Sequence, residues 1–249
     1  MRKPPICWNL VSRFIGAAVF ALLVCGSALG NSTVDYSNGV IPTPPCPFPE
    51  QFKDYQTLPD SISPDKKYAL IYPKRSVLYD LKEYSLYLVN LNPFRILTAI
   101  PLRYSNLAED AHGSYAVNWS KDSLAVVMVE GIKWGADKVF LTTIRNGNVG
   151  SVTDLTEKIT FEVDPDFTES KASRFNYCND FLFKADNTEW NFLNNTQVQI
   201  NCICTTDPVG EIEKDSWTVR FQGVWDISRG DFTSKTITRL PKVLYSSPK

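Results

Sequence analysis

Histidine is nearly absent from this sequence, which has only His112 among its 249 residues. Histidine supplies most general bases and many metal ligands near neutral pH, so its scarcity narrows the catalytic and metal chemistry open to the chain. A surplus of positive charge is also absent, since 26 basic residues stand against 27 acidic ones. Proteins that bind nucleic acid rely on such a surplus, so we expect no nucleic-acid partner.

The short motifs of the common enzyme classes are missing as well. The sequence has no G-x-S-x-G nucleophile elbow, no glycine-rich phosphate loop, no H-E-x-x-H zinc motif and no C-x-x-C pair. We therefore predict no cofactor, no metal site and no catalytic residues. With 43% hydrophobic and 21% charged residues, the composition is that of a folded globular protein and excludes disordered and fibrous chains.

The N-terminus has the pattern of a secretory signal peptide. Its first residues are basic, residues 14–24 are apolar, and small residues follow as far as Gly30. We predict a signal peptide over residues 1–30, cleaved after Ala28 or Gly30, and an exported protein, either periplasmic or secreted.

An uncleaved membrane anchor is the alternative, because the apolar run approaches the shortest length that spans a bilayer. After cleavage we expect no membrane contact. Cleavage removes three basic residues and leaves 23 basic against 27 acidic residues, a net charge of −4.

Four cysteines remain after cleavage. An oxidising compartment favours one or two disulfide bonds among them, and the pairing preferred here joins Cys178 to Cys202 or Cys204. Cys202 and Cys204 are two residues apart, so in a strand they share a face and do not bridge each other. A zinc site and buried thiols are the alternatives. The disulfide candidates are Cys46, Cys178, Cys202 and Cys204.

Most of the mature sequence predicts β-strands. Residues 31–60 are rich in proline, which neither pairs in a central strand nor continues a helix, so we predict an extended arm there. In residues 61–249, apolar runs rich in β-branched and aromatic residues alternate with turn residues. Residues 124–129 show no polar alternation, which is typical of a strand buried on both faces. The predicted strands are 68–72, 84–91, 95–102, 114–119, 124–129, 138–144, 190–193, 197–204, 217–226 and 231–240.

One segment breaks this rhythm and predicts helix. Asp154 and Glu157 have the spacing of a capping box, and Leu155, Ile159 and Val163 lie four residues apart. We predict a helical insertion of one or two short helices within residues 154–177. A strand over residues 160–163 is the alternative.

A short repeat is the most informative signal. Residues 63–71 and 120–127 both read serine, any residue, aspartate, a polar residue and then an apolar strand. Serine and aspartate in these places can hydrogen-bond the backbone of a tight turn. The offset between the copies approaches the length of one propeller blade.

With this turn the chain resembles the WD-repeat-like bacterial β-propellers, namely the Tol-system propeller and the N-terminal propeller of prolyl oligopeptidase-type enzymes. The resemblance is partial, because Lys66 stands where glycine is usual and Lys121 where proline is usual. A weaker third copy spans residues 190–226. Because only three blades can be drawn, we predict a mainly β fold of blade-like antiparallel sheets in an incomplete propeller arc. A β-sandwich is the alternative.

Few residues stand out as candidates for a site. His112, Asp110 and Trp134 fall in loops between strands and are the ligand-binding candidates. A structural role for His112 is the stronger interpretation, because loop histidines of such propellers bond the neighbouring blade. Two carboxylate pairs could bind Ca²⁺ or act on a glycosidic bond, although paired loop acids are usually just solvated. The pairs are Asp164 with Asp166 and Glu211 with Glu213.

We therefore predict an exported, propeller-like binding module whose partner is a protein, a peptide or a glycan. The alternative is a hydrolase that uses His112 or the loop carboxylates. The prolyl oligopeptidase resemblance reaches only the propeller half of those enzymes, so it implies no activity.

Overall fold

A computed structural model describes residues 44, 47–78, 85–101, 113–132, 138–170, 182–206 and 217–240. These residues belong to one compact unit that spans positions 31–249. The predicted signal peptide and half of the predicted arm lie outside the described residues. No helix in the described part of the chain is long and apolar enough to cross a membrane.

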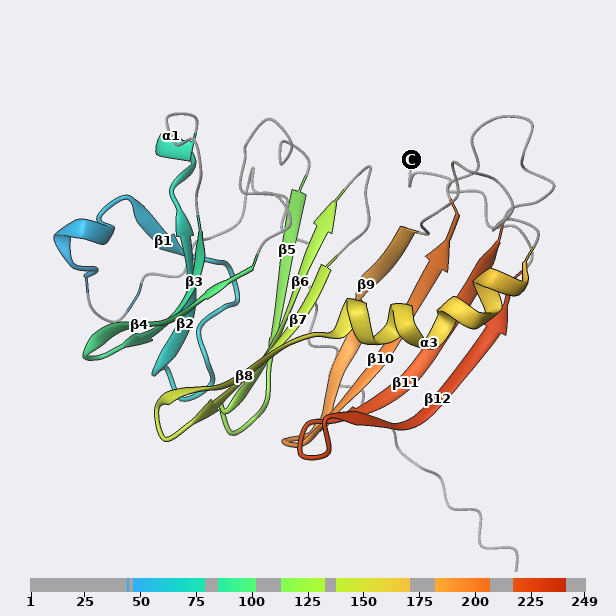
Figure 1. Ribbon diagram of the computed structural model, residues 1–249. Helices are drawn as coiled ribbons and strands as arrows, with labels where there is room; N and C mark the ends of the chain where they lie inside the picture. The colour runs from blue at the N-terminus through green and yellow to red at the C-terminus, as the bar shows by residue number, and fades with distance from the viewer. Residues whose placement is uncertain are drawn as a thin grey trace, which may run out of the picture. The chain divides into compact units, whose positions relative to one another are not determined.

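The described residues form three antiparallel sheets of four strands each, and the mainly β prediction is confirmed (Figure 1). The strands of each sheet follow one another in sequence order. The first sheet holds β1 (Tyr55–Thr57), β2 (Tyr68–Pro73), β3 (Leu86–Leu91) and β4 (Phe94–Ile100). The second holds β5 (Gly113–Trp119), β6 (Ala125–Ile132), β7 (Lys138–Arg145) and β8 (Asn148–Asp154). The third holds β9 (Leu182–Asn194), β10 (Gln197–Thr205), β11 (Thr218–Asp226) and β12 (Asp231–Arg239).

Two strands lie where the sequence predicts none. β1 falls inside the segment predicted as an arm, and it follows the short 3-10 helix η1 (Glu50–Phe52). β8 is rich in polar residues and glycine and is exposed along much of its length. It pairs with β7 as an outer strand, where no buried apolar face is required. A four-residue helix, α1 (Arg75–Leu78), follows β2.

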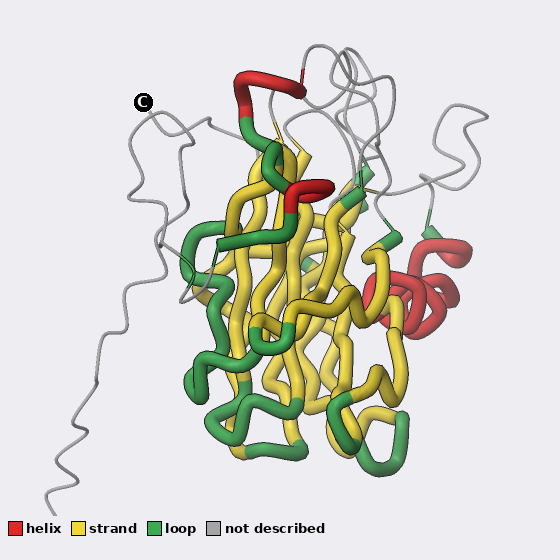
Figure 2. The backbone as a smooth tube through the Cα atoms, turned by 90° about the vertical axis from the view of Figure 1, so that its left-hand side faces the viewer, coloured by secondary structure: helices red, strands yellow, loops and turns green. Residues whose placement is uncertain are grey.

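In the described part of the predicted helical segment, residues 154–170, one helix is present, α3 (Leu155–Glu169), and the alternative strand over residues 160–163 is wrong. Asp154 accepts a hydrogen bond from the Glu157 backbone N–H at 3.0 Å, which fixes the start of the helix. Pro165 lies inside the helix and does not end it. The buried side chains of α3 pack against β7 and β11, and the helix lies beside the strands (Figure 2).

The second sheet is covered on both faces. Val127 and Val129 of β6 join one core with α3 and the third sheet. Val126 and Met128 point the other way and join a second core with the first sheet. All residues of 125–130 are buried, as the unbroken apolar run predicts. Leu124, which was predicted to start the strand, lies in the preceding turn and is exposed.

The two end sheets differ in their outer faces. On the first sheet, Ile71 and Val89 form a small core against aromatic rings from residues 48–55. On the third sheet, the outer face of β10 and β11 carries Gln199 and Gln222, which are exposed. A polar outer face is typical of the last unit in a stacked array. The described sheets therefore end on a polar face at one side and on an aromatic cover at the other.

The two repeat turns have the same hydrogen bonds. Ser63 Oγ donates to Asp65 Oδ1 at 2.7 Å and accepts from the Tyr68 backbone N–H at 2.9 Å. Ser120 makes the matching bonds, at 2.7 Å to Asp122 Oδ1 and at 2.9 Å from the N–H of the first β6 residue. The Ser123 hydroxyl accepts from the Asp65 backbone N–H at 3.0 Å, so the two turns also bind each other.

The third sheet has a different turn in this place. β9 and β10 are joined by two residues, and Asn194 Oδ1 accepts a hydrogen bond from the Thr196 backbone N–H at 2.8 Å. The weaker third copy is thus a four-stranded sheet without the serine–aspartate turn. In the pairing of β11 with β12, the register shifts between Val224 and Trp225, where Thr233 of β12 is the extra residue.

Candidate functional site

The three residues predicted as ligand-binding candidates, His112, Asp110 and Trp134, lie outside the described residues. The same holds for Cys46, Cys178, Glu211 and Glu213. Their roles stay predictions.

The preferred disulfide bond from Cys178 to Cys202 or Cys204 is not formed. Both cysteines lie on the inner face of β10, where Val198 and Ile200 also point, and their side chains are buried in the core between the second and third sheets. Burial accounts for this outcome, because both thiols pack in the core as small apolar groups. Buried thiols are the alternative that the sequence left open.

The carboxylates of Asp164 and Asp166 do not form a pair. Both residues lie in α3, where positions two apart point to different sides of the helix. Asp164 is exposed. Asp166 Oδ1 accepts from Trp217 Nε1 at 2.6 Å and from Arg239 Nη2 at 2.9 Å, so it fastens the helix to the third sheet.

A cleft of about 290 Å³ opens between the second and third sheets. It lies along the second half of β7 and the part of β8 that pairs with it, and beside the turn that joins β11 to β12. Helix α3 contacts β7 away from the cleft, where Thr156 Oγ1 accepts a hydrogen bond from the backbone N–H of Val139 near the start of the strand. The cleft is lined by Leu141, Thr143, Arg145, Ser151, Thr153, Trp225, Ile227, Ser228, Arg229 and Gly230.

Arg145 reaches the cleft from the last position of β7. The next residues, Asn146 and Gly147, both have positive φ, at 51° and 72°, which gives the tight hairpin turn that asparagine–glycine favours. A Cβ atom on Gly150 would lie 3.1 Å from Cγ of Arg145, so the missing side chain leaves space for the arginine stem. Arg95 of β4 holds the same turn by donating to the Gly147 carbonyl at 2.6 Å.

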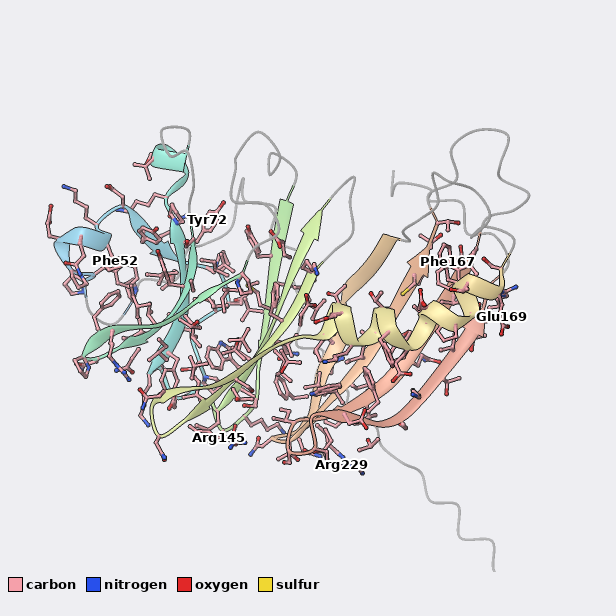
Figure 3. All side chains as sticks on the ribbon, viewed as in Figure 1. Phe52, Tyr72, Arg145, Phe167, Glu169 and Arg229 are labelled. Carbon is pink, nitrogen blue, oxygen red and sulfur yellow. The ribbon has the colours of Figure 1, made fainter. Side chains whose placement is uncertain are left out.

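Arg229 reaches the cleft from the turn between β11 and β12. Asp226 Oδ1 accepts from the backbone N–H groups of Ser228 and Arg229 at 2.9 and 3.0 Å, which orders the turn. Gly230 closes it with a φ of 65°. Figure 3 shows Arg145 and Arg229 at the same end of their sheets.

The lining of the cleft combines hydroxyl groups with apolar side chains. The hydroxyl groups of Thr143 and Ser151 lie 2.8 Å apart and share a hydrogen bond across β7 and β8. Thr153 and Ser228 add further hydroxyl groups, which both donate and accept hydrogen bonds. Leu141 is buried, and Trp225 is only 3% exposed, so the indole offers little open surface to a ligand.

The charge of the lining is uniformly positive. Its ten residues include two arginines and no carboxylate. Within the described part of the chain, neither Arg145 nor Arg229 forms an ion pair. On a chain with a net charge of −1, this is a local concentration of positive charge that a bound anion would neutralise.

Sequence reasoning missed this cleft. The asparagine–glycine dipeptide after Arg145 is a strong hairpin signal that places an arginine beside a turn. Nothing in the sequence, however, shows that this turn and the turn at Arg229 lie on neighbouring sheets. Among the described residues, no group of histidine, cysteine, aspartate and glutamate has the arrangement of a metal site.

Comparison with protein-family models and with curated proteins finds no match for the chain. The likeness to WD-repeat-like propellers therefore rests on the sequence pattern of the repeat turns.

Proposed function

We propose that the chain is an exported, propeller-like binding module and that it holds an anionic ligand in the cleft between its second and third sheets. The observation that carries the proposal is the pair of arginines, Arg145 and Arg229, at a hydroxyl-lined cleft without any carboxylate in its lining.

The positions of both arginines support a binding role. Each side chain comes from a hairpin turn with fixed geometry, ordered by positive-φ residues and by hydrogen bonds to Asp226 or from Arg95. An ordered backbone at the base of each arginine reduces the conformational entropy that is lost when a ligand binds. The two hairpin turns are ordered by backbone conformation and by hydrogen bonds that do not involve the guanidinium groups of Arg145 and Arg229, so both groups are available to a ligand.

The propeller-like character of the proposal rests on the repeat. The two serine–aspartate turns occupy equivalent places, before the second strand of the first and second sheets, and in each the serine hydroxyl donates to the aspartate and accepts from the first N–H of the strand. Binding residues lie preferentially on loops that a rigid scaffold positions, and this cleft lies beside two hairpin turns of neighbouring sheets.

Array binding tests the proposal. The mature protein is applied to an array of glycans and acidic peptides, beside an Arg145→Gln/Arg229→Gln double variant and a Lys121→Gln control. Lys121 lies in the exposed turn that precedes β6, outside the cleft lining. We expect the wild type and the control to bind anionic members of the array and the double variant to lose that binding. Equal binding by all three proteins, or binding restricted to neutral members, would contradict the proposal.

A further inference from the structure

We infer, on the basis of the proposed binding function, that the cleft takes a carboxylated sugar residue, such as a hexuronic acid, either free or within a glycan. The inference depends on the kind of hydrogen-bonding groups in the cleft, on the groups that are already occupied, and on its size.

The charged groups of the cleft suit a carboxylate. Both cations are arginines, whose planar guanidinium group forms two parallel hydrogen bonds to a carboxylate. The stem of Arg145 packs over Gly150, and the backbone of Arg229 is held by Asp226, so the base of each arginine side chain is ordered.

The backbone groups that would favour a phosphate are already occupied. Phosphates bind preferentially to clusters of backbone N–H groups, above all at helix N-termini. The N–H groups of Ser228 and Arg229 donate to the Asp226 carboxylate. The start of α3, next to Thr153, is capped by the carboxylate of Asp154. The N–H groups of Ser228 and Arg229 in the lining are therefore already used and do not form a phosphate-binding cluster.

The neutral groups of the cleft suit a sugar. Ser151, Thr153 and Ser228 carry hydroxyl groups that can donate to and accept from the hydroxyl groups of a pyranose ring. Leu141 and Ile227 supply apolar contacts for the C–H groups of such a ring. A small carboxylate such as acetate has no hydroxyl groups to pair with these side chains and no ring to cover the apolar ones.

The size of the cleft points to one sugar unit. Its volume of about 290 Å³ lies near the lower end of the range for small-molecule sites, about 300–1,000 Å³. That space suits a single ring, with the rest of any glycan extending into solvent.

Isothermal titration calorimetry with defined probes tests the inference. The mature protein is titrated with glucuronate, galacturonate, glucose, acetate, inorganic phosphate and a short glutamate-rich peptide. We expect glucuronate or galacturonate to bind at least tenfold more tightly than glucose, acetate or phosphate. We expect Arg145→Gln and Arg229→Gln each to weaken uronate binding about tenfold or more, and Lys121→Gln to leave it unchanged. Thermal unfolding of each variant confirms that it is folded.

A second variant separates a sugar site from a general anion site. Ser228→Ala removes one hydroxyl group and no charge, so it should weaken uronate binding and leave any weak acetate binding unchanged. A uronic-acid disaccharide distinguishes the two sources of the ligand. Equal affinity for monosaccharide and disaccharide supports the free sugar or a chain end, and tighter disaccharide binding supports a glycan interior.

The outcomes that overturn the inference differ from those that overturn the proposed function. Arginine-dependent binding of phosphate or of the acidic peptide, with no preference for a uronate, overturns the sugar inference and leaves the binding function standing. Equal affinity for glucose and glucuronate also overturns the inference. Absence of arginine-dependent binding for every probe, together with a negative array, overturns both.

Discussion

The serine of each repeat turn fixes the start of a buried strand. Ser63 is 2% exposed and Ser120 is fully buried, and each hydroxyl accepts the backbone N–H of a residue that begins a central strand. A buried N–H that loses its acceptor costs about 1–3 kcal/mol. We expect Ser63→Ala and Ser120→Ala each to lower the free energy of unfolding by that amount in urea denaturation.

The matched control for these variants is Ser234→Ala on the exposed outer strand β12. It should change stability by no more than about 0.5 kcal/mol. If Ser63→Ala and Ser120→Ala changed the free energy of unfolding as little as this control, the hydrogen bonds of the two serines would not stabilise the fold.

The partner of Ser63, Asp65, makes the first turn sensitive to acid. Burial alone would raise the pKa of Asp65, but hydrogen bonds from Ser63, from Lys67 and from Ser123 outweigh it and lower that pKa from 3.8. A carboxyl group whose pKa is lower in the folded state stabilises the fold above its unfolded pKa, and this contribution is lost as the pH falls through the folded pKa.

We therefore expect Asp65→Asn to reduce stability at pH 7 and the difference from wild type to shrink as the pH falls below about 4. Urea midpoints measured at a series of pH values check this, with Asp164→Asn on the exposed side of α3 as the control. A difference that grows with acid would show that Asp65 is stabilised in its protonated form.

At the scale of elements, the carboxylate of Asp166 helps to attach α3 to the third sheet, beside the packed apolar face of the helix and the Glu162–Lys235 ion pair. Asp166 accepts hydrogen bonds from the buried Trp217 indole N–H and from Arg239. We expect Asp166→Ala to lower the free energy of unfolding by about 1–3 kcal/mol, because the indole N–H loses this acceptor.

The comparison for this prediction is Asp164→Ala, which removes an exposed carboxylate from the same helix. Its effect should stay within about 0.5 kcal/mol. Chemical denaturation followed by tryptophan fluorescence measures both variants, and similar losses in the two would mean that Asp166 does not anchor the helix.

Elements with a strong apolar period could be predicted from the sequence, and outer elements could not. β6 buries a continuous apolar run, and β10 buries every second residue. Both patterns are visible in the sequence and predict the strands. β8 is mostly exposed and polar, so it carries no such pattern. The capping box at Asp154 predicts where α3 starts, but the segment after Pro165 reads as a second start because proline usually breaks a helix.

The candidate site could not be predicted for a related reason. Arg145 and Arg229 lie far apart in the sequence, and each is an ordinary exposed residue beside a turn. They come together only because the second and third sheets share a core, which no local pattern encodes. The cysteines illustrate the opposite case, since the alternation in β10 places Cys202 and Cys204 correctly on one face but leaves their chemical state open.

At the scale of the whole described unit, the three sheets are stacked through two cores and end on two unlike outer faces. The two faces of the third sheet should therefore respond differently to substitution. Phe221 is fully buried on the inner face, and its neighbour Gln222 is exposed on the outer one. We expect Phe221→Ala to cost about 3–5 kcal/mol and Gln222→Ala to stay within about 0.5 kcal/mol.

Thermal or urea unfolding of these two neighbouring variants tests where the stack ends. A large loss for Gln222→Ala would mean that a further layer covers the outer face, and the stack would then be longer than three sheets.

The central claim is that the cleft between the second and third sheets is the ligand site, and amide chemical shifts test it most directly. Two-dimensional ¹H–¹⁵N spectra of the mature protein are recorded during a titration with glucuronate. We predict shifts concentrated at residues 141–153 and 225–230, which vanish in the Arg145→Gln/Arg229→Gln variant. Shifts concentrated elsewhere in the assigned spectrum, or unchanged by that double substitution, would contradict the account.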